Sequence, residues 1–75
     1  MEMDTEKIDQ TILALLYLTL HDENRAWKSF DWDAMNRLHE TGYIFDPVNK
    51  AKSVALTEEG LREAERLFMK LFAKG

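Results

Sequence analysis

A stretch near the N-terminus that is apolar on almost every helical face constrains this chain more than any other feature. Its apolar residues recur at helical spacing at Ile8, Ile12, Leu15, Leu16 and Leu20, and others lie on further faces at Leu13, Tyr17 and Leu18. The pattern predicts a helix that is buried on most sides. A chain of 75 residues without cysteine has neither a disulfide nor a thiolate-bound metal to support it, and its core is small. We therefore expect one domain, residues 1–75, that shares surplus apolar surface with a second subunit.

The charge of the chain limits its partners. Fourteen acidic and ten basic residues give a formal net charge of −4, which disfavours nucleic acid and anionic membranes. The charge is uneven, because residues 1–23 carry −5 whereas residues 24–30 carry +2. Any positive surface must therefore be narrow.

The N-terminus and the apolar runs predict a cytoplasmic protein. The first seven residues are charged, unlike a signal peptide. The longest apolar run, residues 12–18, has seven residues, far short of the roughly 20 that span a bilayer. We expect no membrane partner.

Capping residues predict the helix boundaries. Asp4 or Thr5 can begin the first helix, and Asp31 can begin a second that covers residues 32–41 and ends at a left-handed Gly42. Thr57 can begin the last helix. The apolar stripe of this last helix comprises Leu61, Ala64, Leu67, Phe68, Leu71 and Phe72.

Two short strand-like runs lie between the second and third helices. Residues 43–45 and 53–56 are separated by a turn with proline and asparagine, which predicts a two-stranded hairpin. The expected fold class is α+β and mostly α: a long helix, a short helix, a winged-helix-like hairpin, and a C-terminal helix that packs on the first.

The sequence offers little catalytic chemistry. His21 and His39 are the only histidines and lack metal-ligand spacing, and Asp31 and Asp33 suit the start of a helix. No glycine-rich phosphate loop or nucleophile elbow is present. We expect no enzyme, no cofactor and no metal.

Three aromatic residues lie close together in the sequence at Trp27, Phe30 and Trp32. We expect them to seal the corner between the first two helices. A small-molecule pocket that uses Trp27, Trp32 and Tyr17 is the alternative.

The second half of the chain resembles a winged helix-turn-helix domain. Residues 38–44 (LHETGYI) and 56–60 (LTEEG) are similar to segments of regulators of the multiple-antibiotic-resistance type. The resemblance implies a DNA-binding transcriptional regulator. Two features depart from it: only ten residues, 21–30, stand where a positioning helix is needed, and residues 31–40 carry −2.

Taken end to end, the chain is similar to a family of short uncharacterised bacterial proteins, a domain of unknown function. The segments LLYLTLHD (residues 15–22) and FDWD (residues 30–33) carry this resemblance. It implies no activity and no catalytic residue.

Two functions remain open. The first is a noncatalytic module that binds itself or another protein through the terminal helices; we expect a homodimer. Its candidate surface is Leu13, Tyr17, Leu18, Phe68, Leu71 and Phe72. The second is winged-helix DNA binding, with candidate contacts at Arg25, Lys28, Arg37, Lys50 and Lys52.

Overall fold

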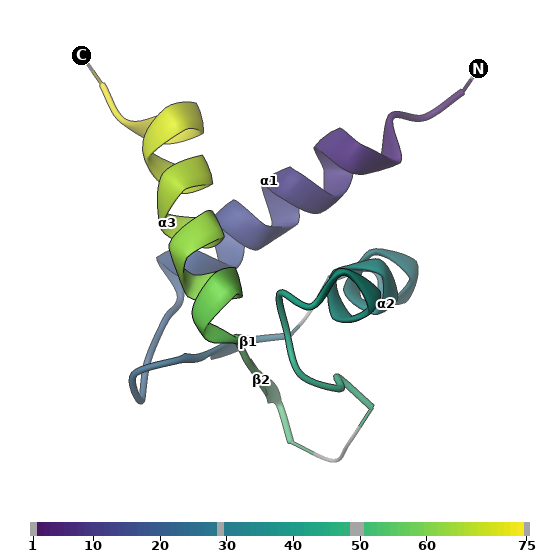
Figure 1. The fold of residues 1–75 in the computed structure, drawn as a ribbon, viewed down its shortest axis with the longest axis vertical. Helices are drawn as coiled ribbons and strands as arrows, with labels where there is room; N and C mark the ends of the chain where they lie inside the picture. The colour runs from purple at the N-terminus through teal and green to yellow at the C-terminus, as the bar shows by residue number, and fades with distance from the viewer. Residues whose placement is uncertain (1, 29, 49–50, 75) are drawn as a thin grey trace.

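Three helices and a two-stranded antiparallel sheet make up the described part of the chain. The computed structural model describes residues 2–28, 30–48 and 51–74. Its elements, in order, are α1 (Thr5–Leu18), β1 (Arg25–Trp27), α2 (Trp32–Thr41), β2 (Ser53–Ala55) and α3 (Glu58–Phe72). Helices α1 and α3 cross, and the sheet lies near the start of α3 (Figure 1). The predicted α+β, mostly helical class is confirmed.

All three helices begin at a side-chain cap that the sequence predicts. The caps are Asp4 for α1, Asp31 for α2 and Thr57 for α3, and each accepts a hydrogen bond from the backbone N–H three residues later, at 3.0, 3.2 and 3.0 Å. Helix α2 ends at Gly42, whose φ of 92° lies in the left-handed region. Local sequence therefore determines where these helices start.

The predicted hairpin is wrong in one of its strands. Strand β2 lies where expected, but its ladder partner is β1, which comes from the segment between the first two helices and not from residues 43–45. Residues 43–45 contribute the isolated bridge between Ile44 and Leu56, and the Phe45 N–H donates to the Ala55 carbonyl at 2.9 Å. The register pairs Arg25 with Ala55, Ala26 with Val54, and Trp27 with Ser53.

The side chain of Arg25 explains part of this long-range pairing. Its Nε donates to Ser53 Oγ at 2.7 Å and its Nη2 donates to the Ser53 carbonyl at 3.0 Å. On the opposite face of the sheet, Ala26 and Val54 are buried in the core. Contacts between residues so far apart in sequence cannot be found from a local strand pattern.

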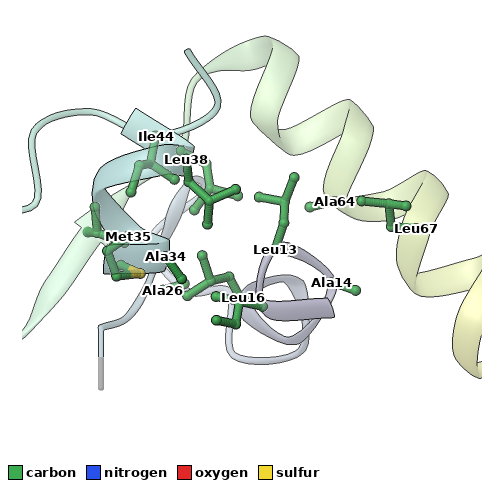
Figure 2. Packing of buried hydrophobic residues seen from close by; sticks show 13 residues of the cluster. Leu13, Ala14, Leu16, Ala26, Ala34, Met35, Leu38, Ile44, Ala64 and Leu67 are labelled. Atoms are coloured by element: carbon green, nitrogen blue, oxygen red, sulfur yellow. The ribbon is translucent and has the colours of Figure 1, made fainter. Parts of the chain in front are cut away.

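The hydrophobic core lies where the three helices meet the sheet. Figure 2 shows Leu13 of α1 between Leu38 of α2 and the Ala64 and Leu67 side chains of α3. The buried apolar residues are Ile12, Leu13, Ala14, Leu16, Ala26, Ala34, Met35, Leu38, Ile44, Val54, Leu56, Ala64 and Leu67. The core is thus drawn from every element.

The aromatic corner differs from the expectation. Phe30 packs against the core, but Trp27 and Trp32 are 51% and 54% exposed. Trp27 alternates with the buried Ala26 along β1, so its ring points outward and stacks on His21, with ring centroids 4.5 Å apart. Only one of the three aromatic residues helps to close the core.

Candidate interaction surface

The apolar stripe of α3 continues beyond the helix that it packs on. Gly60, Ala64 and Leu67 are buried, and Leu71 follows at the same helical spacing but is 46% exposed. Helix α1 ends at Leu18, and the C-terminal turns of α3 extend past it (Figure 1). The last turn of α3 therefore exposes apolar residues that nothing in the described part of the chain covers.

An aromatic cluster borders this open end. The rings of Tyr17 and Phe68 lie 5.2 Å apart between centroids with a tilt of 47°, and Phe68 meets Phe72 at 5.6 Å, edge to face. Tyr17 and Phe68 are half-buried, whereas Phe72 is 46% exposed. Such tilted pairs are favourable ring geometries, so the cluster presents an ordered apolar edge.

Five of the six predicted surface residues belong to this end of the molecule. We call them the terminal apolar surface: Tyr17, Leu18, Phe68, Leu71 and Phe72.

The sixth predicted residue, Leu13, does not belong to the surface. It is 1% exposed, because its side of α1 faces α2 and α3 in the core. Sequence reasoning also missed Met69, which is 53% exposed beside Phe68. Met69 directly follows the stripe residue Phe68, and a rotation of about 100° per residue places it beside the stripe rather than in it, so the stripe alone does not include Met69.

Two of the predicted nucleic-acid contacts near the sheet, Arg25 and Lys28, bind other residues of the chain. Arg25 binds Ser53 as described above, and Lys28 Nζ donates to the Pro47 carbonyl at 2.6 Å. Lys52 is exposed, and Lys50 lies outside the described residues. Two of these cations therefore hold the sheet and the loop before it together.

Arg37 joins α2 to α1. Its Nε and Nη2 donate to the two carboxylate oxygens of Asp9 at 2.7 and 2.8 Å. This hydrogen bonding is the main reason that the pKa of Arg37 is raised above its ordinary value. The guanidinium is thus bound to a neighbouring helix.

The described residues hold few features of other site types. Within residues 2–28, 30–48 and 51–74, no three His, Asp or Glu side chains gather as a metal-ion site would require. In the same ranges, no helix has the length and apolar character needed to cross a bilayer. Of the three residues of the predicted aromatic pocket, Tyr17 contacts Phe68, Trp27 stacks on His21, and Trp32 is exposed at the start of α2.

The fold and this surface define a small, mostly helical α+β protein with an open apolar end. The chain belongs to the DUF6429 family, a domain of unknown function, whose model matches residues 4–74. It is 61% identical over 74 residues to the uncharacterized protein y4hR of Sinorhizobium fredii (strain NBRC 101917 / NGR234), a match that covers 99% of this chain and 100% of the relative. The resemblance to such a family is confirmed, and the family description assigns no activity.

No solved structure matches the chain. The winged-helix likeness of its second half therefore stays a prediction.

Proposed function

We propose that this protein is a noncatalytic interaction module that forms a homodimer through the terminal apolar surface. The observation that carries the proposal is the exposure of Leu71, which continues the buried stripe of α3 where α1 has already ended. Leu18, the last residue of α1, is 64% exposed and follows Tyr17, whose ring contacts Phe68 of α3. Contiguous apolar patches on soluble proteins commonly mark protein contacts.

The charges around the surface favour a second copy as the partner. The end of α3 carries Lys70 and Lys74, whereas the turn that follows α1 carries Asp22 and Glu23. A two-fold axis can place the basic end of α3 in one copy near the acidic turn of the other, and the reverse contact forms by symmetry. The apolar side chains then form the centre of the interface and the charges form its rim.

Light scattering coupled to size exclusion tests this proposal. We expect the wild-type chain at micromolar concentration to have twice its chain mass of 8.8 kDa. Leu71→Glu places a charge in the interface and is expected to restore the single-chain mass. Val48→Glu is the matched control, because Val48 is 70% exposed in the loop before β2 and lies outside the terminal apolar surface. Equal masses for wild type and Leu71→Glu contradict the proposal.

The alternative, a winged-helix DNA-binding regulator, has less support. Arg37 is the single lysine or arginine of α2 among the described residues, and its two side-chain hydrogen bonds go to Asp9. Three acidic residues surround it between positions 31 and 40. A duplex-binding assay at low salt tests this function, with Lys50→Glu and Lys52→Glu combined as the variant expected to weaken it.

A further inference from the structure

Two exposed aromatic side chains lie on the face of the sheet that points away from the core. Trp27 follows the buried Ala26 in β1 and is 51% exposed. Phe45 follows the buried Ile44 on the other side of β2 and is 55% exposed. Because successive residues of a strand point to opposite faces, both rings lie on the outer face. The strands that carry them are two strand spacings apart, about 10 Å.

Two cations of the sheet have no carboxylate within ion-pair distance among the described residues. Arg25 reaches across to β2, and both acceptors of its bonds are uncharged oxygens of Ser53. Lys52 is exposed, and its carbonyl accepts a hydrogen bond from the Lys28 N–H at 3.1 Å, which places it at the Trp27 end of the sheet. The described strand segments hold three basic residues and one acidic residue, at 24–28, 43–48 and 51–56. The sheet is therefore positive in a chain whose net charge is −4.

The indole of Trp27 is held in position by its neighbours. The imidazole of His21 stacks on it, with ring centroids 4.5 Å apart and planes inclined by 28°. His21 Nδ1 donates to the Thr19 carbonyl at 3.0 Å, and the His21 backbone exchanges two hydrogen bonds with Arg25, at 2.8 and 3.0 Å. Because the imidazole covers one face of the indole, the opposite face is open to a second flat ring.

The turn that brings His21 to this position has a disfavoured backbone. Asp22 and Glu23 have φ angles of 47° and 73°, in the left-handed region that residues other than glycine rarely adopt. Trp27 stays half exposed in the resulting stack, so the arrangement adds little to the core. Backbone strain that orders an exposed group is a feature of binding sites.

We propose that the outer face of the sheet binds single-stranded nucleic acid. One base stacks on the open side of Trp27, and a second base stacks on Phe45. The phosphates that join them lie beside Arg25 and Lys52. Several sheet folds bind unpaired bases in this way, with exposed aromatic rings and cations next to them.

The chemistry of the face favours a single strand over a duplex. Stacking needs only the flat face of a base, which is free in a single strand and covered by the next base pair in a duplex. Two phosphate contacts form a small footprint, which matches a narrow positive surface on an acidic chain. The sheet lies near the start of α3, whereas the terminal apolar surface includes its last turn (Figure 1). The site therefore does not depend on dimerisation.

Tryptophan fluorescence tests the stacking directly, because the chain has two tryptophans of nearly equal exposure. Trp32 is 54% exposed on α2, outside the sheet, and serves as the matched control. The probes are deoxythymidine and uridine strands of about eight nucleotides, within the range of known single-strand sites. We expect saturable quenching in the Trp32→Phe chain, where Trp27 is the fluorophore. The emission of the Trp27→Phe chain should not change. The two strands distinguish DNA from RNA as the source of the bases.

Affinities of the labelled strands, measured by fluorescence anisotropy, provide the second arm. Trp27→Ala should weaken binding about tenfold, the scale of one stacked base, and Trp32→Ala should leave it unchanged. Lys52→Gln alters an exposed side chain, so it should leave the fold intact while it lowers the slope of log affinity against log salt by about 0.7.

Four results would each overturn the proposal. They are equal binding of a duplex of the same length, equal binding of polyglutamate, equal effects of Trp27→Ala and Trp32→Ala, and no saturable quenching at low salt. Equal binding of the duplex would instead favour the winged-helix function, and equal binding of polyglutamate would show that the sheet binds acidic chains of any kind.

Discussion

Helix propensity and the packing of this protein predict opposite changes in stability for the substitution Gly60→Ala. In an isolated helix the substitution stabilises by about 1 kcal/mol. Here Gly60 lies in the first turn of α3 against the backbone of Tyr43, and an added Cβ would be 1.8 Å from the Tyr43 carbonyl oxygen and 2.7 Å from its carbon. Since real Cβ contacts essentially never fall below 3.0 Å, the backbones must separate by about 1.2 Å, the difference between 3.0 and 1.8 Å.

The separation has a cost that can be estimated from the same contacts. The Tyr43 carbonyl accepts hydrogen bonds from the Thr57 backbone N–H at 3.0 Å and from the Thr57 hydroxyl at 3.2 Å. Overpacking against rigid backbone costs about 3 kcal/mol, and a weakened hydrogen bond costs about 1 kcal/mol more. The helix propensity of alanine offsets about 1 kcal/mol of this. We expect Gly60→Ala to destabilise the fold by about 3 kcal/mol.

Thermal and urea unfolding followed by circular dichroism measure this change. For a domain of this size, about 3 kcal/mol corresponds to a fall in Tm of roughly 12–24 °C. Gly42→Ala is the control, because its Cβ would meet nothing within 4 Å and the cost comes only from a φ of 92°. That variant should lose about 1 kcal/mol. A Gly60→Ala chain as stable as the wild type would refute the close approach of α3 to Tyr43.

Three further predictions concern the core, the α3 cap and the contact between α1 and α2. Leu13→Ala should lower the free energy of unfolding by about 3 kcal/mol because it leaves a cavity, whereas Leu18→Ala should lower it by less than about 0.5 kcal/mol in dilute, monomeric solution. Similar urea midpoints for the two variants would contradict the burial of Leu13 and the exposure of Leu18. Thr57→Ala should lose about 1 kcal/mol with its cap, and Thr57→Ser should recover most of it in the same assay; an unchanged Thr57→Ala midpoint would show that the cap contributes nothing. Arg37→Lys should lower the Tm, because lysine cannot make both bonds to Asp9, and added salt should reduce the difference from wild type; identical melting curves at low salt would argue against the pair.

The helices could be predicted from sequence because their signals are local. Asp31, Thr57 and Gly42 act on backbone groups within a few residues, and each ends or begins a helix where its chemistry requires. Strand β1 could not be predicted in this way. It has three residues, and its stability comes from β2 and from the bonds of Arg25 to Ser53, 28 residues away.

The candidate surface could be predicted in part for a related reason. A helical stripe shows that Leu71 and Phe72 share a side with buried residues, but it does not show where the covering helix ends. The same limit explains why Leu13 was wrongly placed on the surface. The apolar pattern of α1 does not show which of its faces is buried, and in the structure α2 and α3 cover the face that carries Leu13. The positions of basic residues were equally undetermined, because the partner of Arg37 is on another helix.

Sedimentation equilibrium of the wild-type chain over a wide concentration range tests the central claim most directly. If the terminal apolar surface joins two copies, the weight-average mass rises from 8.8 kDa at the lowest concentrations towards twice that value and stops there. A two-fold interface closes on itself, so no larger species should form. A mass of 8.8 kDa at every concentration, up to the solubility limit, would contradict the account.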